Sequence, residues 1–303
     1  MGFSMIVSLR IAVACAAAAA SFALAGPVQA AGSSDNGAYH LFQTPEQMQR
    51  TGRTPPHLGA GEMEYFGGSV FSNVKVVSVI WGSKVNPQTV ADIPDFLTAL
   101  PNSTFVDQLS IYDTNLHGVH HKGTNQNIER GTFLGQVQIK PKDKKLLLTD
   151  KMVQQELEYQ IGIGALPMND LNTLYMIYFP TDITIKLGQA VSCQDFGAYH
   201  FATSKTVSPS NIFYAVMPDC SAGFGFLTFA SSHEFAEATT DNIPTPGSKP
   251  KYPQAWNTSD GYEIADLCED SDGTLTAGTN NYEVTQVYLN TTGACSTGNY
   301  TSP

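Results

Sequence analysis

Three side chains able to bind a metal ion or transfer a proton lie close together in the segment HEFAE, residues 233–237. If this segment is helical, His233 and Glu237 are four residues apart and project from one face, where both can bind a single ion. Glu234 then lies beside the ion and can accept a proton from water, as in the HExxH zinc motif with Glu in place of the second His. The spacing predicts His233 and Glu237 as metal ligands and Glu234 as the catalytic base.

The alternative for this motif is a charged helix surface, where His and Glu occur at these positions without binding a metal. The preceding segment, residues 224–230, is apolar and indicates a buried helix. Inside a protein, two carboxylates and an imidazole need a compensating charge, which a metal ion supplies. The composition of this helix therefore favours a metal site over a solvated surface.

A catalytic zinc needs a third protein ligand and keeps one position open for water. The downstream segment YEIADLC, residues 262–268, provides two carboxylates. We predict Glu263 as the ligand and Asp266 as the acceptor that orients the ring of His233, since a ligating imidazole usually donates its other N–H to a carboxylate or carbonyl. The roles of Glu263 and Asp266 can be exchanged.

Zinc is the cofactor that the presence of His233 favours. An oxygen-rich ligand set also suits calcium or another hard divalent cation. Two further side chains, His200 and Tyr262, are candidates for stabilising a tetrahedral intermediate, although such residues more often contribute to packing. The histidines of residues 117–121 are interpreted as part of a surface loop.

The cysteines predict two disulfides. Cys15 lies in the N-terminal apolar segment, which leaves an even number in the rest of the chain. An even set in an exported chain indicates disulfides, and four cysteines allow three pairings. We favour Cys193 with Cys220 and Cys268 with Cys295 because each pair closes a short local loop. A cysteine-rich metal site is the alternative, but no Cys-x-x-Cys spacing supports it.

The first 30 residues have the pattern of a secretory signal peptide: Arg10 precedes an apolar run over residues 11–25, and the segment VQA follows at 28–30. We therefore expect a secreted protein, extracellular or periplasmic. Residues 31–68, rich in Gly, Pro, Ser and Gln, are predicted to be a flexible arm, a wrapped leader or a removable pro-segment, and residues 69–303 a metallohydrolase domain. No later segment is long and apolar enough to span a bilayer.

The acidic composition restricts the partners. The formal net charge is −11, which argues against nucleic acid or an anionic membrane as the main partner. An exported metallohydrolase would act on an extracellular protein or peptide. A serine hydrolase is not supported, because the sequence has no Gly-x-Ser-x-Gly motif.

Hydrophobic periodicity predicts strands and helices that alternate along the chain. The first helix is expected to start at Asn86-Pro87, with Asn86 as the cap and Pro87 at the first helical position. Pro94 is expected to kink or split this helix. Strands separated by helices indicate an α/β or α+β fold, a single domain with a mixed sheet flanked by helices. The predicted strands are residues 74–81, 174–179 and 212–217, and the predicted helices are residues 87–100, a helix from Thr149 or Asp150, and 224–240.

Two linked motifs, HEFAE at 233–237 and EIADLC at 263–268, resemble those of the phosphate-induced, EXORDIUM-like secreted proteins of plants and their bacterial relatives. These have a His-Glu-x-Ala-Glu segment followed by Glu-Ile-Gly-Asp-x-Cys. A looser likeness covers VSVIWG from Val77, FLTAL from Phe96 and VSCQDFGAYH from Val191. The resemblance implies an extracellular protein with zincin-like ligands, from a family known for growth and wall-related effects rather than a defined reaction.

Two functions therefore stay open from the sequence. The first is a secreted zinc metallopeptidase, with the same machinery able to hydrolyse a non-peptide bond. The second is a non-catalytic extracellular binding or signalling protein in which the metal is structural.

Overall fold

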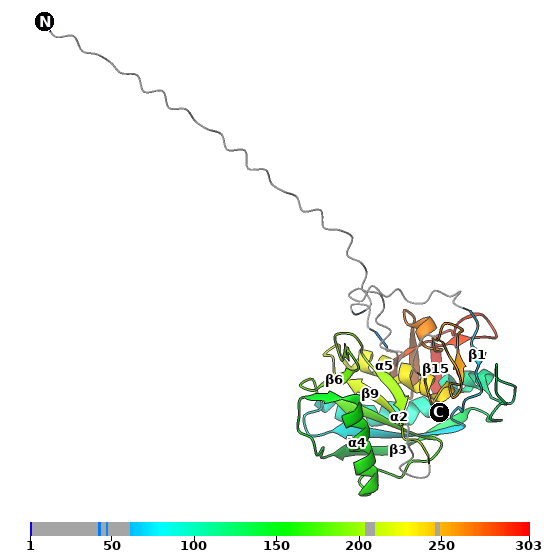
Figure 1. The fold of residues 1–303 in the computed structure, drawn as a ribbon, viewed down its shortest axis with the longest axis horizontal. Coiled ribbons are helices and arrows are strands. Elements are labelled where there is room, and N and C mark those ends of the chain that lie inside the picture. The colour runs from blue at the N-terminus through cyan, green and yellow to red at the C-terminus, as the bar shows by residue number, and fades with distance from the viewer. Residues whose placement is uncertain (2–41, 44–46, 48–60, 204–209, 246–248) are drawn as a thin grey trace. The chain divides into compact units, whose positions relative to one another are not determined.

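A five-stranded sheet in the order β3-β2-β5-β9-β8 forms the centre of the fold (Figure 1). Neighbouring strands are parallel from β3 to β9, and the edge strand β8 runs antiparallel to β9. The mixed sheet predicted from the sequence is confirmed. The strands are β2 (Asn73–Trp81), β3 (Glu129–Ile139), β5 (Thr173–Phe179), β8 (Tyr199–Ala202) and β9 (Phe213–Pro218).

The computed structural model describes Met1, Phe42, Gln43, Gln47 and residues 61–203, 210–245 and 249–303. The described residues from Phe42 to Pro303 belong to one compact unit. The predicted signal peptide, Met1 apart, lies outside the described residues. Within the described ranges, no helix combines the length and the apolar character needed to cross a membrane.

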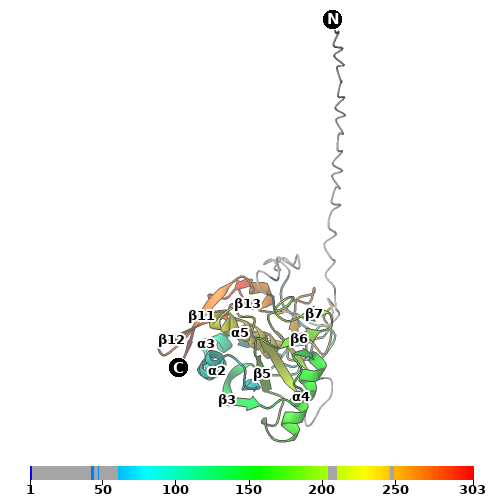
Figure 2. The ribbon, with the colours of Figure 1, turned by 90° about the vertical axis from the view of Figure 1, so that its left-hand side faces the viewer.

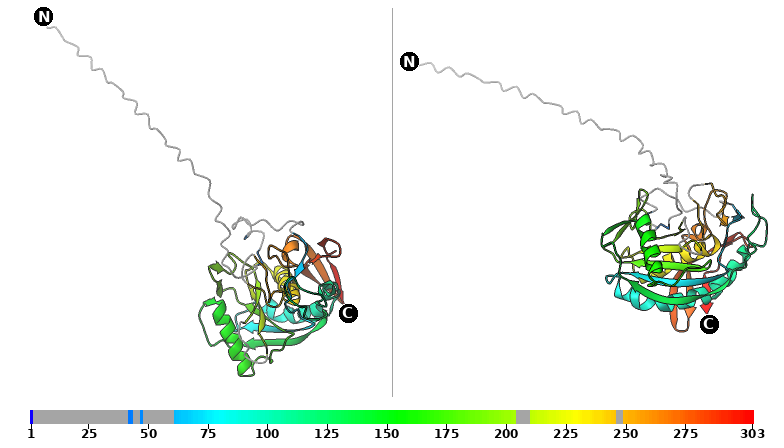
Figure 3. Two further views of the ribbon diagram at one scale, coloured as in Figure 1. Left: turned by 45° about the vertical axis from the view of Figure 1, so that its right-hand side comes forward. Right: turned by 60° about the horizontal axis from the view of Figure 1, so that its bottom comes forward.

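At the centre of the sheet, β2, β5 and β9 are buried on both faces because these strands are apolar at successive positions. Along β2, Val76 and Ile80 belong to one hydrophobic cluster, whereas Val77 and Val79 belong to another. Helix α4 (Asp150–Gly162), green in Figure 3, covers the second face, and the yellow helix α5 (Phe224–Thr240) covers the first together with α2 (Pro87–Ala99). The helices that the sequence predicted therefore flank the sheet as expected.

Helix α2 continues through Pro94, where the sequence predicted a kink or a split. Asn86 caps its start by accepting a hydrogen bond from Gln88 N at 2.9 Å. Pro94 has no N–H for the carbonyl of Val90, but Gln136 Nε2 donates to that carbonyl at 3.0 Å. This replacement donor from β3 explains why the helix tolerates the proline.

Helix α5 lies between the sheet and a three-stranded C-terminal sheet, as Figure 2 shows. Every residue from Leu227 to Thr240 is buried, so the helix is apolar on most sides rather than amphipathic. Thr285 N donates to Ser232 Oγ at 2.9 Å and ties the C-terminal sheet to the helix. The C-terminal strands, which the sequence did not predict, are β11 (Asp272–Ala277), β12 (Asn280–Thr285) and β15 (Asn299–Ser302).

The remaining elements are short and connect the main layers. Strand β1 (Glu64–Tyr65) pairs with β10 (Trp256–Asn257). The others are strands β4 (Leu147–Thr149), β6 (Thr184–Leu187), β7 (Ala190–Val191), β13 (Tyr288–Leu289) and β14 (Ala294–Cys295), and helices η1 (Leu100–Asn102), α3 (Thr104–Asp107), η2 (Gln108–Tyr112) and η3 (Asp266–Cys268).

Residues 61–68, the end of the segment predicted as an arm, a wrapped leader or a pro-segment, pack against the body of the protein; the rest of that segment, apart from Phe42, Gln43 and Gln47, lies outside the described residues. Met63, Tyr65 and Phe66 are buried, and the ring of Tyr65 lies 5.2 Å from that of Trp256. Burial of these apolar side chains stabilises the packed position of residues 61–68. The composition of residues 31–68, rich in Gly and polar residues, does not show this local apolar character.

Candidate metal centre

Helix α5 supplies three of the side chains at the candidate metal centre. His233, Glu234 and Glu237 are all at most 1% exposed. The helical spacing brings His233 Nε2 to 3.0 Å from Glu237 Oε1. The predicted arrangement of His233 and Glu237 on one face of a buried helix is therefore present.

The segment after β10 adds a carboxylate to this pair. Asp266 N donates to Glu237 Oε1 at 3.2 Å, and Asp266 Oδ2 accepts from Glu263 N at 3.0 Å. These bonds direct Asp266 Oδ1 toward His233 Nε2, 3.8 Å away. One ligand atom from each of His233, Glu237 and Asp266 lies within 4.8 Å of the other two. The three form a group that can hold a metal ion.

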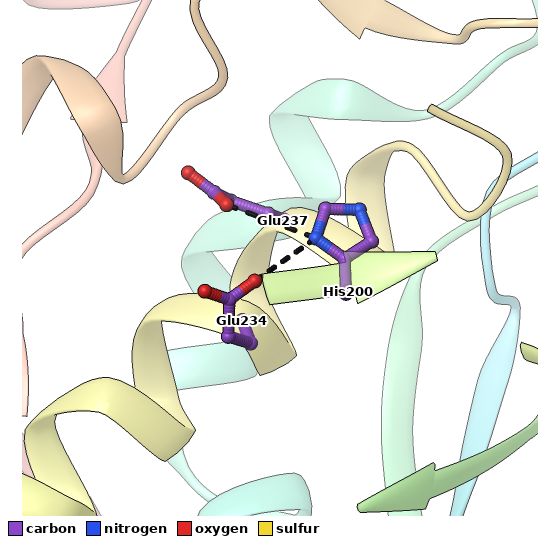
Figure 4. Close-up of side chains that lie close together, drawn as sticks. All are labelled: His200, Glu234 and Glu237. Atoms are coloured by element: carbon purple, nitrogen blue, oxygen red, sulfur yellow. Dashed lines mark hydrogen bonds and ion pairs between the residues drawn. The ribbon is translucent and has the colours of Figure 1, made fainter. Parts of the chain in front are cut away.

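Edge strand β8 brings His200 to the same cluster (Figure 4). His200 Nδ1 lies 3.1 Å from Glu234 Oε2 and 3.8 Å from Glu237 Oε2. These three residues form a second group within 4.8 Å, which shares Glu237 with the first. On its other side, His200 Nε2 lies 3.5 Å from Glu263 Oε1. Both ring nitrogens of His200 therefore lie close to carboxylates.

One hydrogen bond sets the tautomer of His200. Its Nε2 lies 3.0 Å from the carbonyl oxygen of Asp241, which can only accept, so Nε2 carries the hydrogen. In the neutral ring, Nδ1 is then an acceptor that faces Glu234 Oε2. Burial lowers the pKa of His200, which favours the neutral ring. The protonated Glu234 carboxyl can therefore donate to Nδ1 and is held in one orientation by it.

Burial also shifts the carboxylates. It raises the pKa of Glu234 to about 8, an effect that His233 partly opposes and the charge of Asp266 reinforces. The pKa of Glu237 is raised well above its ordinary value by burial and by the charges of Asp266 and Glu234. Burial, followed by the charge of Glu237, raises the pKa of Glu263 in the same way. The cluster holds more negative groups than its surroundings compensate.

Several buried polar atoms of the cluster have no hydrogen-bond partner among the described residues: both ring nitrogens of His233, Oε1 of Glu234 and both carboxylate oxygens of Glu263. An unpartnered buried polar group costs about 1–3 kcal/mol. The 3.0 Å approach of His233 Nε2 to Glu237 lacks hydrogen-bond geometry, but two ligands of one tetrahedral zinc lie about 3.3 Å apart. The side chains present therefore fit a divalent cation.

Among the side chains that the structure describes, no lysine or arginine takes the place of such an ion. Within the described residues, the ion-pair partners of Glu234, Glu237 and Glu263 are histidines, never a lysine or an arginine. A divalent cation would supply the missing positive charge and bind Nε2, the ring nitrogen of His233 that lies beside Glu237 and Asp266.

The structure brings the predicted site residues together and groups two of them differently from the first of the two predicted assignments. Asp266, expected to orient His233, lies in the group with His233 and Glu237, whereas Glu263, expected as the ligand, lies against His200. The geometry favours the exchanged assignment. The histidines 117, 120 and 121 are exposed, as expected for a surface loop.

His200 is the site residue to which sequence reasoning gave too little weight. The sequence predicts His200 and, separately, Tyr262 only as candidates for stabilising a tetrahedral intermediate, and Tyr262 is partly buried. In the structure His200 is 2% exposed and contacts carboxylates of the cluster. An uncommon histidine inside an apolar strand was the only signal for this role.

Both disulfides have the predicted pairing. Cys193 is bonded to Cys220 and Cys268 to Cys295, and both pairs have the same sequence separation of 27 residues. Cys268 ends helix η3, two residues after Asp266, so its bond holds the segment that carries this candidate ligand close to β14. Disulfides are typical of proteins that fold in an oxidising compartment.

We expect the two disulfides to affect the metal site unequally. Because the closed loops have equal length, replacing either pair by serines should reduce the free energy of unfolding of the metal-free protein by a similar amount, about 3–4 kcal/mol. Only loss of Cys268–Cys295 should also weaken metal binding strongly, since it releases Asp266. Urea denaturation and metal titration of the two double variants check this. Equal loss of metal affinity in both would contradict the role of the Cys268 segment.

Comparisons with known proteins give no relative for this chain: no family model matches the sequence, and no curated protein and no solved structure is significantly similar to it. The function is therefore inferred from the chemistry of the site.

Proposed function

We propose that this protein is a secreted, zinc-dependent hydrolase of peptides, in which His233, Glu237 and Asp266 bind the ion and Glu234 transfers protons. The observation that carries the proposal is the buried group formed by His233, Glu237 and Asp266, whose ligand atoms lie within 4.8 Å of one another. The predicted signal peptide and the two disulfides support a location outside the cytoplasm.

Each side chain has one task in this scheme. A divalent ion bound by the three ligands would polarise the scissile carbonyl and acidify the attacking water. Glu234 accepts the proton of that water and delivers it to the leaving amine. His200 Nδ1 lies 3.1 Å from Glu234 Oε2 and accepts a hydrogen bond once that carboxyl has taken up the proton, so it orients Glu234 for delivery of the proton. The positive charge of the ion would also lower the raised pKa of Glu234, which leaves it available as a base near neutral pH.

Zinc suits this ligand set better than calcium. Zinc accepts one imidazole and two carboxylates in a tetrahedral site with one open position. Calcium takes six to eight oxygen ligands, whereas the group around His233 provides a nitrogen and few oxygens. The nitrogen therefore favours zinc, the borderline ion, over calcium.

Removing the ion is expected to destabilise the protein. A ligand present at 1,000 times its Kd stabilises the folded state by about 4 kcal/mol, which in a domain of this size corresponds to about 8 °C in melting temperature. Thermal unfolding with and without a chelator, followed by return of zinc or calcium, measures the effect. An unchanged melting temperature would contradict the metal site, and recovery with calcium alone would contradict zinc.

The direct test of hydrolysis is digestion of a peptide mixture by the purified protein, with products identified by mass spectrometry and with the Glu234→Gln variant as the inactive control. The account predicts zinc-dependent cleavage by the wild type. Products that persist in Glu234→Gln would come from a contaminant or from another site.

A non-catalytic extracellular binding or signalling protein is the second candidate. His233 is completely buried, which suits an ion that only holds α5 to the segment carrying Asp266, and the EXORDIUM-like motifs agree with this function. In that case Glu234→Gln would leave the biological effect unchanged, whereas His233→Ala would unfold the protein. Assays of hydrolysis on the same two variants distinguish the candidates.

A further inference from the structure

A short part of the N-terminal segment lies directly on the metal centre. The ring of Phe42 is 4.8 Å from that of His233 and 5.6 Å from those of Phe226 and Phe229. Phe42 is only 3% exposed. An apolar side chain from a distant part of the sequence therefore fills a pocket whose wall includes a proposed metal ligand.

The main chain of this segment adds to the edge of the central sheet. Phe42 forms an antiparallel bridge with Ala198, which directly precedes the edge strand β8, and Gly197 N donates to the carbonyl of Phe42 at 2.7 Å. An extended peptide binds a sheet edge in this manner, because main-chain hydrogen bonds hold it and pockets accept alternate side chains. The same strand carries His200 into the site.

The main-chain N–H of the next residue, Gln43, also binds the body of the protein. Gln43 N donates to Glu269 Oε1 at 2.9 Å, and Gln43 Nε2 donates to the carbonyl of Asp195 at 2.7 Å. The bonds of the Phe42 carbonyl and the Gln43 N–H use groups that every peptide has. The segment is therefore held as a peptide would be, with the ring of Phe42 as its distinctive side chain.

The pocket is shaped for a large side chain. A Cβ atom at Gly197 would come within 2.9 Å of Phe226 Cζ and 3.1 Å of Phe42 Cδ1, so the glycine leaves the space in which the two rings meet. Phe226 also lines a cavity of about 280 Å³ at the start of α5, together with Phe224 and Leu227. Phe226 thus contributes both to the Phe42 pocket and to this cavity, whose lining also includes polar residues such as Asn86, Thr89 and Asp219.

We propose that the pocket around Phe42 is a substrate subsite, which accepts a large apolar or aromatic side chain of an extended peptide bound along β8, and that the chain's own Phe42 and Gln43 occupy it here as an autoinhibitory contact. This inference rests on the proposed hydrolase function and names its substrate class. It also explains why His233 is fully buried: the segment that covers it must leave before a substrate reaches the ion.

The test measures binding rather than turnover. The probe is a fluorescently labelled synthetic peptide with the sequence of residues 39–46, compared with the same peptide carrying Ala in place of Phe42, on zinc-loaded full-length protein that also carries Glu234→Gln. In the protein that keeps its own Phe42, the tethered segment competes with the probe peptide for the pocket at high effective concentration. The Phe42→Ala protein is therefore expected to bind the Phe peptide at least about tenfold more tightly than the protein with Phe42 does. The Ala peptide should bind weakly to both proteins.

A second variant covers the case in which Phe42→Ala fails to fold. Gln43→Pro keeps the ring of Phe42 but removes the N–H that donates to Glu269, and it should also strengthen binding of the Phe peptide. Phe42→Leu, which refills the pocket, should behave as the wild type. If the folded variants bind the two peptides equally, or no more tightly than the wild type does, the subsite is wrong.

Hydrolysis by the same variants, with Glu234 restored, separates this inference from the proposed function. Tighter and Phe-dependent binding without any cleavage would retain the subsite and reject the hydrolase. Cleavage that shows no preference for a large apolar residue would retain the hydrolase and overturn the subsite.

Discussion

His233→Ala is expected to abolish metal binding and hydrolysis together. His233 supplies the only nitrogen in its group of candidate ligands, and its two ring nitrogens have no hydrogen-bond partner among the described residues. Loss of an outer-shell partner already costs about 10–100-fold in metal affinity, so loss of this ligand should cost more than about 100-fold. Metal content by mass spectrometry and peptide hydrolysis, measured on the same samples, check the prediction.

The matched control is His120→Ala, since His120 is an exposed histidine of the 117–121 loop. This variant should keep the metal and the activity of the wild type. Because His233 is buried, the circular dichroism of His233→Ala is compared with that of metal-free wild type, which shows whether the fold survives the substitution. A folded His233→Ala protein that still holds its ion would contradict the assignment of this ligand.

Glu234→Gln is expected to separate binding from chemistry. The amide has the volume of the carboxyl group and can donate to His200 Nδ1 as the protonated carboxyl does. Metal content and melting temperature should therefore stay near those of the wild type. The rate of hydrolysis should fall by about 10²–10⁴-fold, the usual contribution of a positioned acid or base.

Glu156→Gln is a suitable control for this substitution. Glu156 is also a buried carboxylate, but it lies in α4 on the other side of the sheet and accepts hydrogen bonds from Gln160 Nε2 and Lys142 N. It should not alter metal content or the rate of hydrolysis. Loss of the metal in Glu234→Gln would instead make Glu234 a ligand in the group with His200 and Glu237, and an unchanged rate would reject it as the base.

Local patterns in the sequence predicted the elements that carry the motif. Helix α5 begins and ends at the predicted residues. Its continuous apolar run and the 233–237 motif are local features of the sequence, so they could be recognised without knowledge of distant contacts. The disulfide pairing was equally local, since each bond closes a loop of the same short separation. Strand β2 was clear from its run of β-branched residues.

The parts that the sequence did not predict depend on contacts between distant residues. The site role of His200 follows from the antiparallel pairing of β8 with β9, which four residues of strand do not reveal. The choice between Glu263 and Asp266 depends on one turn, where Asp266 accepts from Glu263 N and directs its other oxygen to His233. The packing of Phe42 against His233 joins residues 191 positions apart in the sequence, and no periodic pattern encodes it.

The measurement that tests the central claim most directly is the metal content of the purified full-length protein after dialysis against zinc and then against metal-free buffer. The account predicts about one tightly held zinc per chain, which is absent from His233→Ala and retained by Glu234→Gln. A wild-type protein that is folded and holds no divalent ion would contradict the metal centre, and with it the proposed hydrolase.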